Sequence, residues 1–378
     1  MNIEIYFETE KVFHKRVLKL SDSFNFFNFL NDLGLINNGL GQEQIEEKFL
    51  KSDCAGKRTC IFDISDTVTL NSFVFENIVF FVKMLAHLNI KHILVNNPPN
   101  LLFSVLRNMP NVTIHRVPSF KRIKVSRINQ LKKDLANNII GQNDAKQIIY
   151  RKLIIQSIRN SSKPLVVMFY GEPGVGKTEV AKQISKTLYR SSDVLREQMS
   201  MTGSNASIEY FKATGHNADS FSKKLLNRES NILLLDEFAL APDYIQTSFF
   251  QLFDEGKFVD QNYSVDMSNS IIICTSNFIS RQEIYATINP ALLSRFDALI
   301  HFKGFSEPEK IEVSERIISE YFKSKRIKQQ YLEQLDIAEV TGFLKRNISK
   351  QSNFREIRTV TEDIIVDTLI RKGVFQEK

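Results

Sequence analysis

The sequence predicts an α/β protein in three parts: a small N-terminal α/β domain, an αβα domain with a parallel sheet, and a small all-α domain. Apolar strand patterns alternate with helical patterns over the first 117 residues, which is typical of an α/β domain. Further apolar strands, again separated by helical segments, follow between residues 137 and 303. After Gly304 the pattern is helical and rich in charge.

In the first part, the residues predict a hairpin followed by strands that alternate with helices. The expected strands are Asn2–Phe7, Val12–Leu18, Thr59–Ile64, His92–Val95 and Val112–His115. The expected helices are Ser21–Leu35, Phe73–Leu88 and Leu101–Met109. We therefore place an N-terminal α/β domain at residues 1–120.

A basic segment follows this domain. Six Lys or Arg side chains and no acid lie between Lys121 and Lys133, and we interpret residues 121–136 as a solvated linker. The second domain is placed at 137–303, with helices at Asn143–Arg159 and Thr178–Tyr189 and strands at Leu165–Tyr170, Ile232–Leu235 and Ile271–Thr275. Residues 304–378 form the third domain. No internal repeat is visible.

Composition narrows the classes of protein. Hydrophobic residues make up 43% and charged residues 25% of the 378 residues, as in soluble globular proteins. No window holds 18 uninterrupted apolar residues, and the start of the chain lacks the basic-then-apolar order of a secretory signal. The three cysteines have no metal-ligand spacing. We expect a cytoplasmic protein without a membrane partner.

Glycine is scarce, yet three of the 14 glycines fall within one short segment that fits G-x-x-x-x-G-K-[ST] and stands between a strand and a helix. Such a loop points backbone N–H groups at phosphate oxygens, and the helix N-terminus adds partial positive charge. The lysine reaches the β- and γ-phosphates and the threonine binds Mg²⁺. The segment predicts a site for ATP and Mg²⁺ at Gly171, Glu172, Pro173, Gly174, Val175, Gly176, Lys177 and Thr178.

Two carboxylates end the apolar strand that begins at Ile232. Acidic groups at the end of a buried strand are costly unless they have a function there. We expect Asp236 to help hold Mg²⁺ and Glu237 to act as the general base that activates water. Together with the phosphate loop, this pair predicts an ATPase.

From Ile139 to about Arg371 the chain resembles the AAA+ ATPases, specifically the Clp-type unfoldases and disaggregases. The resemblance lies in Ile140-Gly141-Gln142 with Ala145, in 236–243, in 252–257, in 270–277, in 290–297 and in 353–358. It implies that Ile140 and Gly141 pack on adenine and that Asn277 orients the attacking water. It also implies a ring of six subunits, in which Arg295 reaches the neighbour's γ-phosphate and Arg355 contacts the nucleotide in cis. Arg358 is the alternative for the second role.

The sequence departs from that family at the pore loop. The corresponding region, Ser204–Phe221, is shorter and offers Tyr210, Phe211 and Gly215-His216. We favour core positions for the two aromatic residues. The ATPase part has no apolar-Gly-Phe/Leu tripeptide for docking to the Clp peptidase, since Leu33-Gly34-Leu35 lies in the first domain. We therefore expect no proteolytic partner.

Residues 59–117 resemble a STAS domain, in the segments 60–65, 70–72 and 93–96. The resemblance implies a domain that binds a protein partner and has no catalytic residues of its own. Signalling members carry a phosphorylated serine at the start of a helix, and here Asn71-Ser72 stands at that place. A plain helix cap is the favoured interpretation of Ser72.

The sequence thus predicts an ATP-hydrolysing ring protein that remodels a protein partner recruited by residues 1–120. One alternative is a signalling or defence scaffold in which ATP binding drives assembly and the first domains present a surface to an effector. A second is a motor stimulated by nucleic acid, suggested by the net charge of +7 and the basic segment. The histidines at 87, 92 and 115 are interpreted as packed side chains.

Overall fold

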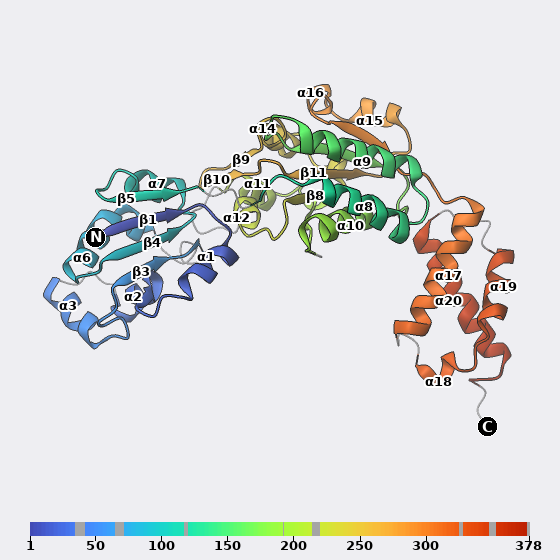
Figure 1. The fold of residues 1–378 in the computed structure, drawn as a ribbon, viewed down its shortest axis with the longest axis horizontal. Coiled ribbons are helices and arrows are strands. Elements are labelled where there is room, and N and C mark those ends of the chain that lie inside the picture. Colours follow the sequence, from blue (N-terminus) through green and yellow to red (C-terminus); the bar gives the residue numbers. More distant parts are fainter. Residues whose placement is uncertain are drawn as a thin grey trace.

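The computed structural model describes residues 1–34, 42–64, 72–116, 120–191, 193–213, 220–324, 328–347 and 353–375. Figure 1 shows three successive parts: an α/β part that holds the N-terminus, a central α/β part, and a group of helices that leads to the C-terminus. Within the described residues, no helix is both long and apolar enough to cross a membrane. The three cysteines are buried.

The first part is a parallel sheet of the order β2-β3-β4-β1-β5. Its strands are β1 (Asn2–Tyr6), β2 (Ser23–Asn25), β3 (Thr59–Phe62), β4 (His92–Asn96) and β5 (Val112–His115). Its helices are α1 (Glu10–Val17), α2 (Phe26–Asp32), α3 (Gln42–Lys51), α5 (Ser72–Glu76), α6 (Ile78–His87) and α7 (Asn100–Leu106). Both faces are covered, because Cys60 and Phe62 join one core cluster and Ile61 joins another with Phe13 of α1.

The predicted N-terminal hairpin is wrong. Residues 10–17 form α1 and not a strand, and the parallel sheet explains why: a parallel strand pair needs a crossover, which is usually helical. The apolar positions Phe13 and Val17 also fit a helix, since they lie four residues apart on one face. The helix predicted from Ser21 begins only at Phe26, after the short strand β2.

The resemblance to a STAS domain is not confirmed. Strand β1 lies between β4 and β5 and pairs in parallel with both, so the chain does not start with a hairpin. Of the pair Asn71-Ser72, Asn71 lies outside the described residues, and Ser72, interpreted as a helix cap, is the first residue of α5. The helix predicted over Phe73–Leu88 is divided near Asn77 into α5 and α6.

The central part holds a second parallel sheet, of the order β12-β6-β11-β8-β7. Its strands are β6 (Leu165–Tyr170), β7 (Leu195–Gln198), β8 (Ile232–Asp236), β11 (Ile271–Ser276) and β12 (Ala298–His301), and β9 (Lys257–Val259) pairs with β10 (Ser264–Asp266) in a separate antiparallel ribbon. Its α-helices are α8 (Val125–Asn138), α9 (Asn143–Ile158), α10 (Lys177–Tyr189), α11 (Asn205–Lys212), α12 (Phe221–Leu226), α13 (Asp243–Gln246), α14 (Phe250–Glu255), α15 (Arg281–Thr287) and α16 (Pro290–Leu293), and short 3₁₀ turns lie at Met199–Met201, Phe238–Leu240 and Thr247–Phe249.

Alternate residues of β8 enter the cores on the two faces of this sheet. Leu233 and Leu235 pack on one face, and Ile232 and Leu234 on the other. A strand that is apolar on both sides in this way is typical of a parallel sheet covered by helices. The αβα architecture predicted for this part is confirmed.

The basic segment is not a solvated linker. From Val125 onward it forms α8, and Ile128, Leu131 and Leu135 of this helix are buried in the core that α9 and α10 share with the sheet. The apolar residues recur at intervals of three and four, so the lysines and arginines occupy the remaining sides of an amphipathic helix. In the sequence, the many Lys and Arg residues of this segment obscured the helical spacing of its apolar residues.

The C-terminal part is all-α, as predicted. It consists of α17 (Glu307–Ser324), α18 (Gln329–Leu332), α19 (Ile337–Asn347) and α20 (Phe354–Arg371). Their apolar faces form a separate core, which also includes Ile140 from the segment before α9. Ile140 is thus one of the contacts between the helical part and the central part.

The two sheets share one strand order. Read from its other edge, the first sheet runs β5-β1-β4-β3-β2, and the second runs β12-β6-β11-β8-β7. When the five strands of each sheet are numbered along the chain, both orders are 5-1-4-3-2. The first part therefore repeats the topology of the central part, although no repeat is visible in the sequence.

Candidate active site

The segment after β6 has the backbone geometry that the glycine pattern predicts. Gly171, Gly174 and Gly176 have φ values of 140°, 79° and 98°, which are strained for residues with a Cβ atom. At Gly171 a Cβ atom would also lie 2.1 Å from the carbonyl oxygen of Phe302. Helix α10 begins at once, at Lys177. Strand, loop and helix N-terminus thus form one phosphate-sized concavity.

Lys177 is buried and projects back across this loop. Its ammonium donates to the carbonyl oxygens of Gly171 at 2.6 Å and Glu172 at 2.9 Å, and to Oδ1 of Asn277 at 3.1 Å. Burial lowers the pKa of Lys177 to about 8, against the opposite effect of the carboxylates of Asp236 and Glu237. A bound phosphate anion would raise this pKa again, because a nearby negative charge favours the protonated form.

The two acidic residues at the end of β8 are held by neighbouring strands. Thr275 on β11 donates its hydroxyl hydrogen bond to Asp236 and accepts one from the backbone N–H of Glu237 at 3.0 Å. Glu237 has a φ of 56°, so its side chain leaves the strand direction. Gln198 at the end of β7 donates to Oε2 of Glu237 at 2.6 Å. Both carboxylates line the same cavity as Lys177.

This cavity has a volume of about 790 Å³, large enough for a nucleotide-sized ligand. Pro173, Gly174, Val175, Gly176, Lys177, Thr178, Asp236, Glu237, Asn277, Ile140 and Arg355, all predicted from the sequence, line it. The hydroxyl of Thr178 and the carboxylate of Asp236 are oxygen donors of the kind that Mg²⁺ prefers. The donors present therefore fit the predicted metal.

The segment before α9 closes one side of the cavity. Ile139 and Ile140 line it, and Gln142 fixes their backbone by donating to the carbonyl oxygen of Lys303 at 2.7 Å and accepting from its N–H at 3.1 Å. Gly141 has a φ of 62° and lies against Glu309 of α17. The apolar wall expected for adenine is thus built at the junction with the helical part.

Helix α20 brings Arg355 to the cavity. The side chain of Asn353 caps this helix by accepting from the N–H groups of Arg355 at 3.0 Å and Glu356 at 3.1 Å. The N–H of Phe354 donates to the carbonyl oxygen of Gly174 in the phosphate loop at 3.1 Å. Arg358 instead pairs with Glu362 at 3.1 Å and is not among the residues that line the cavity, so the geometry favours Arg355 over Arg358.

Arg295 lies away from the cavity of its own chain. Its guanidinium pairs with Asp254 at 2.7 Å and stands 4.3 Å from the centre of the Phe250 ring. It is not among the residues that line the cavity. A role for Arg295 in a nucleotide site must therefore be exercised on another subunit.

In the region of the expected pore loop, the described residues place both aromatic side chains in the fold. Phe211 is buried in the core of the central part, and the hydroxyl of half-buried Tyr210 donates to Glu197 at 2.9 Å. The ring of Phe221 lies close to both. The interpretation as core residues is confirmed, while Gly215-His216 lies outside the described residues.

Four polar residues of the site, Arg196, Gln198, Thr275 and Arg316, escaped the sequence analysis. Arg196 on β7 pairs with Asp236, Thr275 holds both acids, and Arg316 of α17 lines the cavity. No motif marks them, because their positions depend on the order of the strands and on the placement of α17. An Arg and a Gln two residues apart on β7 point to the same face, which is the only local signal for Arg196 and Gln198.

Comparison with known proteins identifies relatives of this arrangement. Residues 163–333 match the family described as "AAA domain (Cdc48 subfamily)". The Clp protease ATP-binding subunit ClpE of Streptococcus pneumoniae is 25% identical over 286 residues, which cover 67% of this chain and 38% of that protein. The chaperone ClpB of Malacoplasma penetrans is 24% identical over 272 residues, covering 65% and 38%. The chain thus spans well under half the length of these relatives.

A solved structure has a related fold. It is a closed-state reconstruction of Hsp104 with ATPγS and FITC-casein, which matches this chain with a TM-score of 0.57. The match covers 100% of this chain and 89% of that chain at 14% sequence identity. At that identity the likeness concerns the fold.

Proposed function

Because residues 163–333 form an AAA+ ATPase domain of the Clp type, we propose that this chain hydrolyses ATP in a ring of identical subunits and uses the energy to remodel a protein. The observation that carries the proposal is the convergence of Lys177, Glu237 and Arg355 on one cavity. They come from the phosphate loop, the end of β8 and the start of α20. Lys177 and Arg355 thus supply two cations, and Glu237 supplies a base, around one cavity large enough for a nucleotide.

The proposed roles follow from these positions. Backbone N–H groups of the phosphate loop and Lys177 bind the phosphates, and Ile140 packs against the base. Thr178 and Asp236 would hold Mg²⁺, which supplies charge neutralisation on the phosphates. Glu237 accepts the proton of the attacking water, and Asn277 orients that water.

Arg295 supports a shared site. A cation that contacts the γ-phosphate stabilises the charge that develops in the transition state. Since Arg295 is held on its own subunit by Asp254 and Phe250, it is available at a surface and not in its own cavity. Hydrolysis would then depend on assembly, as a ring motor requires. The number of subunits, six by analogy with the family, is part of the proposal.

Binding is tested with Lys177→Ala. This variant should lose affinity for a fluorescent ATP analogue, since it removes the charge that faces the phosphates. Lys182→Ala is the matched control, because Lys182 is an exposed residue of the same helix. Retained affinity in Lys177→Ala would refute the assignment of the phosphate loop.

The shared site is tested by mixing subunits. Arg295→Ala and Glu237→Gln should each bind nucleotide and hydrolyse little of it. In mixed rings, each subunit type can supply the part that the other lacks, so some activity should return. Intact nucleotide binding by Arg295→Ala shows that the variant is folded, and absence of recovery would count against hydrolysis at subunit interfaces.

The remodelling role is tested with a trap. Glu237→Gln should hold ATP, and with it any bound protein, and Lys177→Ala serves as the control that cannot load. Cross-linking followed by mass spectrometry then maps the contacts. Diverse captured proteins that cross-link to residues 1–120 support a remodelling motor with a recruiting domain. One stoichiometric protein partner would favour the scaffold alternative, which the core position of Tyr210 and Phe211 also permits.

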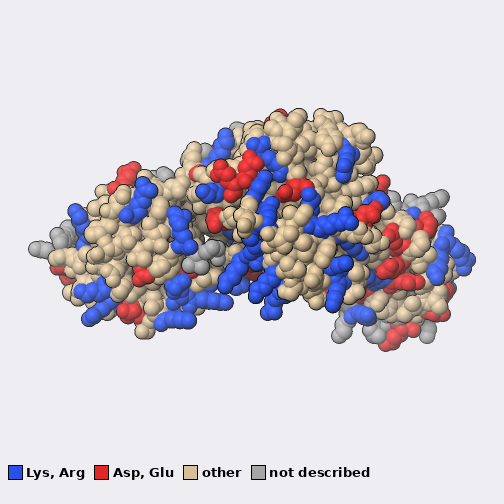
Figure 2. Space-filling view, turned by 45° about the horizontal axis from the view of Figure 1, so that its top comes forward, with Lys and Arg blue, Asp and Glu red and all other residues tan. Residues whose placement is uncertain are grey.

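The nucleic-acid alternative loses its main support. Figure 2 shows Lys and Arg side chains gathered over the middle of the molecule, but several basic residues of the segment 121–133 serve the fold. Arg122 donates to the carbonyl oxygens of Arg159 and Ser161, and Lys132 lies over the ring of Tyr150. ATPase activity should therefore not respond to DNA or RNA at low salt, where a phosphate-binding surface acts most strongly.

A further inference from the structure

The first domain carries an acidic residue at the level where the central domain carries its catalytic base. In the central sheet, Tyr170 pairs with Ser276 and Leu235 with Cys274, which puts Glu237 level with Ser276. In the first sheet, Tyr6 pairs with Asn96 and Phe62 with Val95, which puts Asp63 level with Asn96. Asp63 of the first sheet therefore corresponds to Glu237.

The loop beside Asp63 excludes phosphate. Residues 171–176 separate β6 from α10, whereas only residues 7–9 separate β1 from α1, and no glycine is among them. One carboxylate lies within this short turn and one directly after it: Glu8 is buried and pairs with Arg16 at 3.0 Å, and Glu10 opens α1. An anion would be repelled here. The carboxyl end of a parallel sheet is nevertheless the edge where such folds bind ligands.

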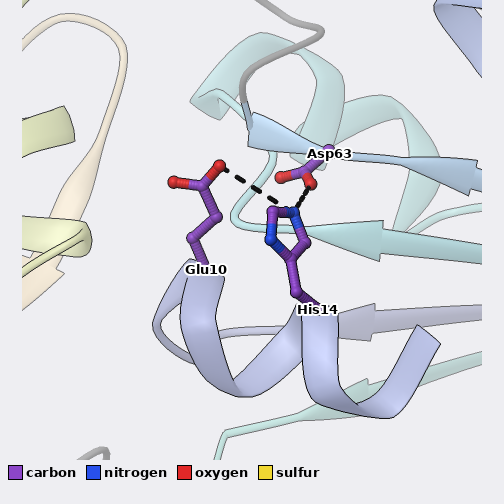
Figure 3. A group of neighbouring side chains, drawn as sticks. All are labelled: Glu10, His14 and Asp63. Carbon is purple, nitrogen blue, oxygen red and sulfur yellow. Dashed lines mark hydrogen bonds and ion pairs between the residues drawn. The ribbon is translucent and has the colours of Figure 1, made fainter. Parts of the chain in front are cut away.

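Three side chains converge at this edge in a geometry that suits a cation. Glu10 and His14 lie one turn apart on α1 and face Asp63, which follows β3 (Figure 3). The Nε2 atom of His14 contacts Oδ2 of Asp63 and lies 3.8 Å from Oε1 of Glu10. The nitrogen and the two carboxylate oxygens all lie within 4.8 Å of one another.

The surroundings of these groups favour one bound ion. Asp63 is buried, and its Oδ1 accepts from the N–H of Ile64 at 2.6 Å, which orients Oδ2 towards His14. Glu10 and Asp63 both approach the same imidazole nitrogen, so their two negative charges lie close together, and a cation between them would offset that repulsion. The side chain of His14 is 49% exposed, so an ion can enter from solvent and keep a water ligand.

We propose that Glu10, His14 and Asp63 bind one divalent transition-metal ion of the Zn²⁺ type. One imidazole nitrogen with two carboxylate oxygens is a ligand set that Zn²⁺ accepts, with water as fourth ligand. Mg²⁺ prefers oxygen ligands only, which separates this site from the nucleotide site. The ion would join α1 to the end of β3.

That position lies beside the contact between the two domains. Lys11, next to Glu10, pairs with Glu229 of the central part at 2.8 Å. Ile64, next to Asp63, is buried in the core cluster of the central part. An ion at this site would therefore order the residues through which the first domain is attached to the ATPase domain.

The test is metal binding by the full-length, untagged chain. Protein stripped with a chelator is titrated with Zn²⁺ against a chromogenic chelator, in excess Mg²⁺. One Zn²⁺ per chain should bind to the original protein and to Lys177→Ala, which removes the nucleotide site from consideration. His14→Ala should lower the affinity at least tenfold, and Glu10→Gln should lower it as well.

His87→Ala is the matched control. The His87 side chain is 51% exposed and pairs with one carboxylate, that of Glu46 at 2.5 Å, so it resembles His14 without the second acid. This variant should bind Zn²⁺ like the original protein. Co²⁺ provides a second reading, because its visible absorption should intensify on binding and should do so in His87→Ala but not in His14→Ala. Absence of stoichiometric Zn²⁺, or unchanged binding by His14→Ala, would overturn the proposal.

Discussion

Asn353 links the helical part to the phosphate loop, and its replacement tests whether that link positions Arg355. Its side chain accepts from two N–H groups at the start of α20 and lies against Gly174, where an added Cβ atom would approach it to 3.0 Å. In Asn353→Ala both N–H groups lose their partner. Loss of a helix N-cap costs about 1 kcal/mol, and at most ~2 kcal/mol.

The effect on binding should be at least as large. A hydrogen bond to a charged group contributes about 1.5–3 kcal/mol, so misplacement of Arg355 should weaken ATP binding by roughly tenfold to a hundredfold. Binding is measured by titration with a fluorescent analogue that is not hydrolysed, and stability by calorimetric unfolding of the same samples. In Asn353→Ala, both the affinity for the ATP analogue and the free energy of unfolding should fall.

Two further variants separate the cap from the charge. Asn353→Ser keeps an acceptor and should retain most of the stability and affinity. Asn353→Asp also keeps the cap, and its charge suits the helix N-terminus, but it adds a carboxylate beside the phosphate loop and should weaken ATP binding without loss of stability. If Asn353→Ala matched the original protein in both measurements, the cap would not position Arg355 and the reasoning would be refuted.

Three other outcomes follow from the structure. Gly171→Ala should lower the free energy of unfolding by about 3 kcal/mol or prevent folding, because φ is positive there and the new Cβ would lie 2.1 Å from the carbonyl oxygen of Phe302. In Gly203→Ala the new Cβ would have no atom within 4 Å, so the free energy of unfolding, measured with a chemical denaturant, should change little. The pKa of Lys177 is lowered to about 8, so above that pH the unfolded chain binds more protons than the folded chain, and the contribution of Lys177 to stability should rise from pH 8 towards 10. Affinity for the ATP analogue should fall over the same range, because the lysine loses its charge. Lys177→Met should show neither trend. Tyr210→Phe should cost about 1 kcal/mol of stability through the lost bond to Glu197 and leave ATPase activity unchanged, whereas a marked loss of activity would indicate a role beyond packing.

The phosphate loop could be predicted because its chemistry is local. Eight consecutive residues supply the positive φ values, the cation and the hydroxyl, and the flanking strand and helix confirm the context. The acids at 236 and 237 were found for the same reason. Arg196, Gln198 and Thr275 were not, since they reach these acids only through the pairing of β7, β8 and β11. The spacing of residues along the sequence does not reveal the order of the strands in the sheet.

The N-terminal domain shows the opposite case. The segment Val12–Leu18 was predicted as a strand, although its apolar residues are spaced four residues apart as in a helix. The parallel crossover that follows β1 requires the helix α1 there. The strand order shared by the two sheets was equally hidden. The glycine loop is the most distinctive sequence feature of the central sheet, and the first domain has no counterpart to it, because only Phe7, Glu8 and Thr9 separate β1 from α1.

The placement of the cavity gives nucleotide binding a mechanical consequence. The phosphate loop, Asp236 and Glu237 belong to the central part, whereas Arg355 and Arg316 belong to the helical part. A nucleotide that contacts groups from both parts binds most tightly when the two parts are placed so that all of these groups reach it. Binding therefore favours that placement of the helical part relative to the central part, by the difference in affinity between it and other placements. Between β12 and α17 the chain crosses from one part to the other at residues 302–306. Under the proposed function, loss of the γ-phosphate would therefore release a constraint between the two parts.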